Sequence, residues 1–168
     1  MNYNIISFVP DEVEKIHKIF VSCGKDMKSR LNLTHWDPPI DIELLSWDAL
    51  KGNVYGVLDV NEFIATFTIS TTPLNYYTPD LWENPEEKAL HVSHLAVLPE
   101  FQGKGIGSWC MKKIEYLAKD WGCSAIRLDA HWKYELSWDF YKKLGYTQRK
   151  TIDYANYRVV CFEKVIEV

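Results

Sequence analysis

Hydrophobic and polar positions follow two different periods in different parts of this chain, which predicts that it contains both helices and strands. Near the start, apolar residues recur at helical spacing, at Val13, Ile16, Ile19, Phe20 and Cys23. This first helix is expected to give way to a looser segment after Gly24. A second short helix is expected over residues 41–51, closed by Gly52, because glycine commonly follows a helix end.

Stretches rich in β-branched and aromatic residues predict strands, because such side chains suit a pleated, partly buried surface. They cover residues 4–9, 53–59, 62–72, 90–98, 125–130, 147–152 and 157–165. Helices are expected over residues 105–121 and 138–144, the second capped by Ser137 and stopped by Gly145. A polar, proline-bearing loop at residues 73–88 contains three aromatic residues, Tyr76, Tyr77 and Trp82.

The order of these elements, β-α-α-β-β-β-α-β-α-β-β, predicts an α/β fold (an α+β mixed sheet) with helices on both faces. We expect a central mixed sheet of about seven strands flanked by about four helices. The chain has 168 residues, 47% of them hydrophobic, which suffices for one domain with a full core. A single domain over residues 1–168 is therefore expected.

A glycine-spaced loop, Gln102-Gly103-Lys104-Gly105-Ile106-Gly107, separates the strand at 90–98 from the next helix. Glycine at every second position lets the backbone turn tightly and approach a ligand closely. The unpaired N–H groups of the helix start, and the positive end of its dipole, face this loop. With Lys104 as an additional cation, the loop is expected to bind phosphate.

Two other phosphate-binding motifs do not fit this loop. The Rossmann fingerprint needs a third glycine where the chain has Ser108, and the Walker motif has no counterpart in the sequence. A nucleotide-binding domain of another fold would need one of these motifs and is therefore disfavoured. A glycine-rich turn before an ordinary helix is the purely structural alternative.

The residues around the loop extend the pattern to Gln-x-x-Gly-x-Gly, preceded by Leu95-Ala96-Val97 and Pro99-Glu100-Phe101. This pattern closely resembles the acetyl-CoA signature of the GNAT superfamily of N-acetyltransferases. A second segment, Phe140-Tyr141-Lys142-Lys143-Leu144-Gly145-Tyr146, is similar to the (L/F)-Y-x-K-x-G-F/Y segment of the same family. The specific part of the resemblance covers about residues 89–164, and the predicted element order matches as well.

The resemblance implies how acetyl-CoA, the cosubstrate, would be bound. The backbone of Leu95, Ala96 and Val97 would pair with the pantetheine arm like an added strand. The N–H groups of residues 102–107 would hold the pyrophosphate. Tyr134 stands where many members of the family place an Asn that contacts the pantetheine side. The implied cofactor-binding residues are Leu95, Ala96, Val97, Gln102, Gly103, Lys104, Gly105, Ile106, Gly107 and Tyr134.

The resemblance also implies two catalytic roles. The Val97 amide would donate to the oxyanion that forms on the thioester carbonyl. Tyr141 would protonate the leaving CoA thiolate, a task for which a solution pKa of about 10 is well suited. The alternative for Tyr141 is a core aromatic residue of a short amphipathic helix.

His91 and His94 are candidates for the base that deprotonates the amine, because histidine titrates near neutrality. Strand side chains alternate, so His91, Ser93 and Leu95 should share one face and His94 should lie on the other. In several GNAT members the residues at the His91 and Ser93 positions face the acceptor, which makes His91 the better base, working through water. A partly exposed histidine at a strand end is the alternative. Zinc binding by this pair is rejected because no third ligand completes a site, and no metal is expected.

The acceptor site is less well indicated by the sequence. Asp129 and Glu100 are expected to be solvated or capping residues. The acidic balance and the aromatic excess favour a small primary amine with an apolar portion as the acceptor. Four aromatic residues could line its pocket, with packing or a rim position as the alternative for each: Trp36, Trp132, Tyr134 and Trp138.

The net charge is −4 and the isoelectric point is near 5.7, whereas a general nucleic-acid binder is usually basic. The four cysteines show no C-x-x-C spacing and are interpreted as reduced thiols. The N-terminal residues do not resemble a signal peptide, and no run of about 18 apolar residues is present. We expect a cytoplasmic monomer or homodimer with no nucleic-acid or membrane partner.

These observations predict an acyltransferase of the GNAT type that uses acetyl-CoA and no metal. It would move the acetyl group to a primary amine of an unidentified acceptor, with a small molecule favoured, by direct attack in a ternary complex. The alternative is a catalytically weak GNAT-like module that binds CoA and serves by interaction.

Overall fold

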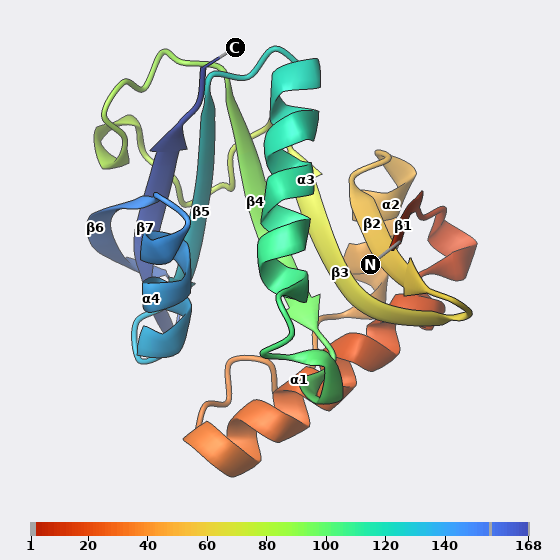
Figure 1. Cartoon of the computed structure of the whole chain (residues 1–168). Helices are drawn as coiled ribbons and strands as arrows, with labels where there is room; N and C mark the ends of the chain where they lie inside the picture. The colour runs from red at the N-terminus through yellow and green to blue at the C-terminus, as the bar shows by residue number, and fades with distance from the viewer. Residues whose placement is uncertain (1–2, 155, 168) are drawn as a thin grey trace. The chain divides into compact units, whose positions relative to one another are not determined.

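The structure, a computed structural model, describes residues 3–154 and 156–167 (Figure 1). Seven strands form a mixed sheet in the order β1-β2-β3-β4-β5-β7-β6, and four α-helices lie among the described residues. This confirms the predicted fold class. The elements in chain order are β1 (Asn4–Ser7), α1 (Glu14–Leu31), α2 (Ile42–Leu50), β2 (Val54–Asp59), β3 (Glu62–Ser70), β4 (Ala89–Val97), α3 (Ile106–Asp120), β5 (Ala125–His131), α4 (Glu135–Lys143), β6 (Thr147–Tyr154) and β7 (Tyr157–Val165).

The chain folds as two compact units. The first comprises Met1–Thr68 and His94–Trp109, and the second comprises Ile69–Ser93 and Cys110–Val168. Strands β3 and β4 and helix α3 each contribute residues to both units. The single domain expected over residues 1–168 stays a prediction, and the two units are described in turn.

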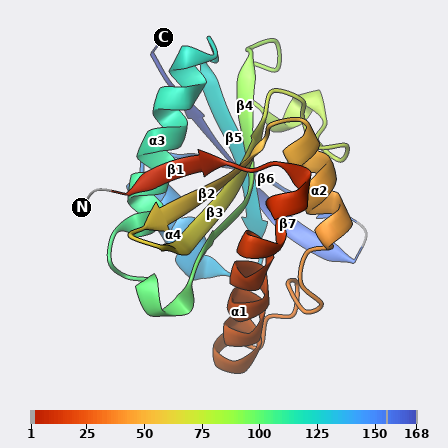
Figure 2. The same cartoon turned by 90° about the vertical axis from the view of Figure 1, so that its right-hand side faces the viewer.

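The first unit is built on an antiparallel ladder of β1, β2 and β3, in which Ile5 opposes Val57 and Tyr55 opposes Phe67. Helices α1 and α2 lie beside these strands (Figure 2). Asp41 caps α2 by accepting a 2.7 Å hydrogen bond from the Glu43 amide, and α2 agrees with the helix predicted over residues 41–51. Helix α1 buries four residues of the predicted apolar stripe together with Gly24 and Met27, and the fifth, Val13, is buried just before the helix; the four are Ile16, Ile19, Phe20 and Cys23.

Helix α1 does not end at Gly24, as the sequence predicted, but continues to Leu31. A Cβ atom at Gly24 would lie 2.2 Å from the carbonyl oxygen of Trp36. The glycine is therefore required by the close approach of another backbone segment and does not mark a helix end. The helix instead ends at Asn32, which adopts the left-handed conformation with φ of 53°, a conformation that Asn tolerates better than most residues.

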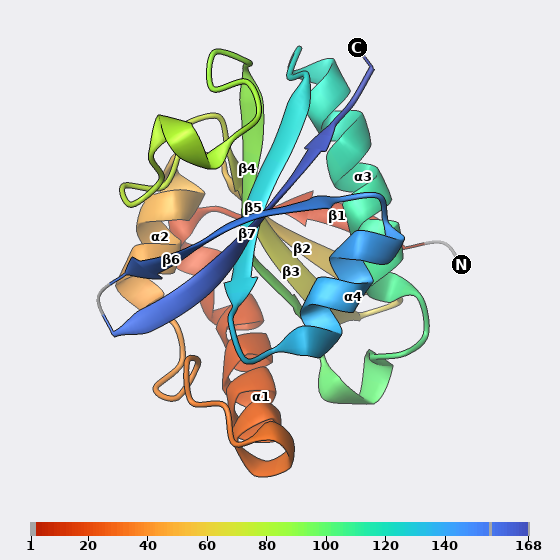
Figure 3. The same cartoon turned by 90° about the vertical axis from the view of Figure 1, so that its left-hand side faces the viewer.

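The second unit contains the parallel pair β4–β5, with His91 opposite Arg127, and the antiparallel pair β5–β7, with Asp129 opposite Cys161. Strands β6 and β7 form the predicted closing hairpin. Helices α3 and α4 lie on one side of β5 and β7, and the segment with the short helix η2 (Pro79–Leu81) lies on the other (Figure 3).

Helix α4 begins earlier than predicted, and Ser137 does not cap it. The helix starts at Glu135, and the Ser137 hydroxyl donates back to the Tyr134 carbonyl at 2.7 Å. A serine can form this bond from inside a helix, so its presence alone does not locate a helix start. Gly145, with φ of 85°, follows the end of α4 as predicted.

Cys23, Cys110, Cys123 and Cys161 are all buried and unbridged in the described structure, as expected for reduced thiols. None of the described helices has both the length and the apolar character that crossing a membrane would require.

Candidate active site

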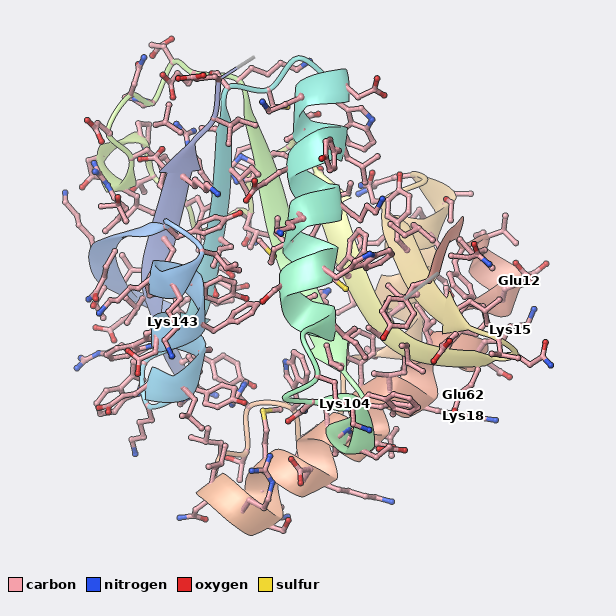
Figure 4. All side chains as sticks on the ribbon, viewed as in Figure 1. Glu12, Lys15, Lys18, Glu62, Lys104 and Lys143 are labelled. Atoms are coloured by element: carbon pink, nitrogen blue, oxygen red, sulfur yellow. The ribbon has the colours of Figure 1, made fainter. Side chains whose placement is uncertain are left out.

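The glycine loop, residues 102–107, leads from β4 into α3 within the first unit and its first four residues are exposed. Gly103 and Gly105 have positive φ values of 74° and 83°, and a Cβ atom at either position would meet nothing within 4 Å. Both positions therefore need glycine for conformation, and the space beside them is open to a ligand. Lys104 lies between them below the start of α3 (Figure 4), with its Nζ 5.3 Å from the centroid of the Phe101 ring.

The Gln102 side chain fixes this loop to the end of β4. Its Nε2 donates to the Val97 carbonyl at 2.9 Å, and the Cys23 thiol donates to the same oxygen at 3.2 Å. Burial raises the pKa of Cys23 to about 12, so this thiol stays protonated and can keep donating. The glutamine of the motif thus has a structural role that its spacing in the sequence did not reveal.

The Gln102 amide was expected to contribute to the pyrophosphate site, but it already donates to the Pro99 carbonyl at 3.2 Å. Among the described residues, no backbone carbonyl accepts from the N–H groups of residues 103–107. These five groups, together with the N-terminal end of the α3 dipole, form a cradle of the kind that binds phosphate. Acetyl-CoA carries such a pyrophosphate, and the exposed loop fits it.

The end of β4 contains an irregularity that the sequence did not predict. His94 has φ of 55°, a left-handed conformation that is uncommon for residues other than glycine. This conformation interrupts the regular alternation of side chains between the two faces of the strand. The prediction that His91, Ser93 and Leu95 share one face depended on that alternation. In the segment predicted to pair with the pantetheine arm, Ala96 is buried while Leu95 and Val97 are partly exposed. In the glycine loop, Ile106, which is also the first residue of α3, is buried.

His94 belongs to the first unit and packs edge-on against Phe20, with ring centroids 6.1 Å apart. Its Nδ1 atom is buried and has no hydrogen-bond partner among the described residues. Burial lowers the pKa of His94 to about 4. The imidazole is therefore neutral at physiological pH and packs as an apolar ring.

His91 belongs to the second unit and is 6% exposed, so it is not the partly exposed strand-end histidine of the alternative reading. Burial and, next, the positive charge of Arg127 lower the pKa of His91 to about 4. The expectation that it titrates near neutrality was wrong, because the sequence shows neither its burial nor its cationic neighbour. Its ring lies 5.6 Å from that of Tyr77 and 6.4 Å from that of Trp82. Its role as the base stays a prediction.

Tyr141 in α4 is 8% exposed and packs against Phe140, Tyr146 and Phe162, with ring centroids 5.1, 5.8 and 5.6 Å away. Burial, followed by the negative charge of Asp129, raises the pKa of Tyr141 above its ordinary value. The phenol is therefore fully protonated at neutral pH. The core packing and the catalytic role proposed for Tyr141 are compatible, and the second stays a prediction.

The predicted aromatic lining of the acceptor pocket is distributed over both units. Trp36 packs edge-on against Phe20 in the first unit, with centroids 5.4 Å apart. In the second, Trp132 is 39% exposed, Trp138 donates to the His131 carbonyl at 3.1 Å, and Tyr134 precedes α4. No ring contact joins Trp132 to Trp138 among the described residues.

Asp129, which was expected to be a solvated or capping residue, is instead the centre of a polar cluster in the second unit. Its Oδ2 accepts hydrogen bonds from the hydroxyls of Tyr76 and Tyr77, at 2.8 and 2.7 Å. Burial raises the pKa of Asp129, and the two phenols only partly offset this shift. The interruption of an apolar strand by a carboxylate was the one sequence signal for this residue. Glu100 is exposed, as expected.

No group of three or more histidine, cysteine, aspartate or glutamate residues in the described part of the chain is arranged to hold a metal ion.

Residues 14–146 match the Acetyltransferase (GNAT) family. Among curated proteins, the thialysine N-epsilon-acetyltransferase of Bos taurus is similar, with 25% identity over 134 residues that cover 73% of this chain and 77% of the relative. The family match covers more than half of the chain and includes β4, the glycine loop and Tyr141.

Solved structures share the fold at low sequence identity. The PaiA N-acetyltransferase of Thermoplasma acidophilum, solved with coenzyme A, has a TM-score of 0.74 and 16% identity, and covers 99% of this chain and 100% of its own. A GNAT-family acetyltransferase of Streptococcus agalactiae has a TM-score of 0.80 and 16% identity, and the match covers 99% of this chain and 96% of the other.

Proposed function

Because the chain belongs to the GNAT family of acetyltransferases, we propose that it acetylates the primary amine of a small acceptor by direct attack in a ternary complex. The family and the acetyltransferase relatives support an acyltransferase that uses acetyl-CoA, rather than the interaction module that the sequence left open. The acceptor and the order of events belong to the proposal.

The observation that carries the proposal is the conformation of the glycine loop. The N–H groups of residues 103–107 have no backbone acceptor in the described structure, and Gly103 and Gly105 leave open space beside them. Gln102 and Cys23 both bond to the Val97 carbonyl. They hold in place the end of β4, where the family resemblance puts the pantetheine arm and the oxyanion donor. Bound acetyl-CoA supplies an activated acetyl group, and the protein's residues position it.

In the proposed reaction the amine nitrogen attacks the thioester carbon, the new C–N bond forms and the C–S bond breaks. The Val97 N–H donates to the carbonyl oxygen as negative charge develops there. Tyr141 donates its proton to the departing sulfur and recovers one from solvent. The hydroxyl of Tyr141 has no hydrogen-bond partner among the described residues, which leaves the proton available for the sulfur.

The amine must lose one proton, and His91 is the proposed acceptor, through water. With a pKa of about 4, His91 is always neutral at physiological pH and can accept a proton, but it is a weak base. The acidity of the amine rises steeply once the C–N bond begins to form, so a weak base suffices at that stage. The acceptor therefore has to arrive as the neutral amine, a form that becomes more abundant as the pH rises.

A small acceptor is supported by the named relatives, which include thialysine N-epsilon-acetyltransferases from two mammals. Thialysine is a small amino acid with a side-chain primary amine. The aromatic residues near the proposed base, Tyr77 and Trp82, are consistent with an acceptor that has an apolar portion.

The test of this proposal compares two glycine variants. Gly105→Asp places a side chain and a negative charge in the cradle, whereas Gly52→Asp makes the same change at a glycine with φ of 72° at the end of α2. Both variants carry similar backbone strain. Acetyl-CoA should raise the melting temperature of the parent and of Gly52→Asp, since a ligand that binds only the native state stabilises it, and should leave Gly105→Asp unchanged.

Thermal unfolding with and without acetyl-CoA measures these shifts. An equal shift in both folded variants would show that the glycine loop does not hold the pyrophosphate, and the proposal would lose its main support.

A further inference from the structure

Strand β5 presents two charged residues, Arg127 and Asp129, on the same face, because they are two positions apart. Across the β5–β7 pair, Arg127 is opposite Glu163 and Asp129 is opposite Cys161. One face of the β5–β7 pair therefore carries two acids, Glu163 and Asp129, two positions apart along the ladder. Their surroundings differ in a way that indicates different roles.

Glu163 has its negative charge neutralised within the protein. Its carboxylate accepts from Arg127 Nε at 2.9 Å and from the Glu83 amide at 2.9 Å, and Arg149 Nε lies 3.6 Å away. Arg127 also donates to the Asn84 carbonyl at 2.6 Å. This network fixes the segment that follows η2 to the sheet, which is a structural role.

Asp129 has no such cation. Its described hydrogen bonds come only from the neutral phenols of Tyr76 and Tyr77, and both go to Oδ2. Its Oδ1 accepts no hydrogen bond from a described residue. A carboxylate removed from water without a cation is costly, and the raised pKa of Asp129 reflects this cost.

The surroundings of Asp129 suit an organic cation. Tyr76 stacks on Tyr154 with centroids 4.0 Å apart and meets Tyr77 edge-on at 5.1 Å. Aromatic faces attract cations as well as apolar groups. Tyr77 also contacts His91, at 5.6 Å between ring centroids, so this cluster adjoins the proposed base within the second unit. Asp129 itself retains partial exposure.

We propose that Asp129, Tyr76 and Tyr77 form a subsite for a second, non-reacting ammonium group of the acceptor, which makes the acceptor a diamine or another amine with two cationic groups. The inference rests on the proposed acetyltransferase function. An ammonium held by a carboxylate is stabilised in its charged form and cannot attack a thioester. The reacting amine must therefore be the other one, near the neutral ring of His91.

The test uses cadaverine and n-pentylamine, which have the same carbon chain and differ by one ammonium group. The parent should acetylate cadaverine with a kcat/KM about 10- to 100-fold higher than that for n-pentylamine. This is the range expected for one charge-assisted hydrogen bond. Asp129→Asn keeps an oxygen that can accept from both phenols and removes the charge. This variant should lower the ratio of the two kcat/KM values, cadaverine over n-pentylamine, to about one. The main cause should be a higher KM for cadaverine.

Glu163→Gln is the matched control, because it removes a buried charge from the same face of the sheet without altering the subsite. It should reduce the melting temperature and leave the preference for cadaverine intact. Asp129→Asn should be at least as stable as the parent, because a buried amide costs less than a carboxylate without a cation. A parent enzyme that acetylates both amines equally well, or an Asp129→Asn variant that keeps the preference, would overturn the inference.

Calorimetric titration with cadaverine separates this inference from the proposed function. If no amine is acetylated, the proposed function fails, while binding of cadaverine that is lost in Asp129→Asn would still support the subsite. If amines are acetylated but cadaverine binds the parent and Asp129→Asn equally well, the proposed function stands and the subsite is contradicted.

Discussion

At the scale of single residues, the environment of each candidate side chain decides which chemistry it can perform. Tyr141 is held by three neighbouring rings and its pKa is raised by burial. A phenol in that setting is always protonated at neutral pH, but it is a weaker acid than in water. In the proposed reaction it would donate this proton as negative charge develops on the departing sulfur, and it would then recover a proton from solvent.

Tyr141→Phe keeps the ring and its packing and removes only the proton. We expect near-normal binding of acetyl-CoA and a kcat about 10²-fold lower, within the usual range for the loss of one general acid. Steady-state kinetics with the best amine, together with a thermal shift with acetyl-CoA, measures both quantities. A turnover close to that of the parent would make Tyr141 a core residue only, and loss of cofactor binding would make it a ligand contact.

His91 links pH to stability. Its pKa is about 4 in the folded protein and about 6.5 in an unfolded chain, so the unfolded chain takes up the proton first as the pH falls. The stability that comes from keeping His91 neutral is complete above about pH 6.5 and is lost between there and about pH 4. His94 contributes in the same direction.

His91→Gln should therefore make the free energy of unfolding less dependent on pH between about 4 and 6.5. The slope should fall by up to about 1.4 kcal/mol per pH unit, which corresponds to one proton. Urea unfolding at a series of pH values measures this slope. If the slope stays that of the parent, His91 is not buried as a neutral ring.

At the scale of the elements, glycines with the same appearance in the sequence have different functions. Gly24 in α1 faces the Trp36 carbonyl, which a Cβ atom would approach to 2.2 Å. Alanine is the better helix former by about 1 kcal/mol, but the clash involves a backbone oxygen that cannot move alone. We expect Gly24→Ala to destabilise the protein by about 1–3 kcal/mol, as measured by chemical denaturation.

Lys25→Ala changes the next position of α1, which is exposed, and is the control for that experiment. It should alter stability by less than about 0.5 kcal/mol. A Gly24→Ala variant as stable as Lys25→Ala would mean that the segment around Trp36 does not press against α1.

The elements were largely predictable from the sequence because hydrophobic periodicity reports them directly. The strand–loop–helix unit of β4, the glycine loop and α3 was found at nearly its observed bounds. The left-handed conformation of His94 was not predictable, because no glycine marks it. The extent of α1 was missed for the opposite reason, since Gly24 resembles a helix stop but serves a tertiary contact.

At the scale of the whole molecule, the glycine loop was more predictable than the cluster around Asp129. The glycine loop is a local motif, so its residues are adjacent in the sequence. Asp129 meets Tyr76 and Tyr77 across 53 and 52 positions of the chain, and no local pattern reports which loop residue reaches which strand. The lowered pKa values of His91 and His94 were missed for the same reason, because burial is a property of the assembled fold.

The central claim is that this chain transfers an acetyl group from acetyl-CoA to a small amine, and mass spectrometry of the amine tests it most directly. Purified protein, acetyl-CoA and a panel of small amines are incubated, and free CoA thiol is measured alongside the amine products. We predict an amine that gains one acetyl group, in an amount equal to the thiol released. Thiol release without an acetylated amine, or acetyl-CoA binding with neither product, would contradict the claim.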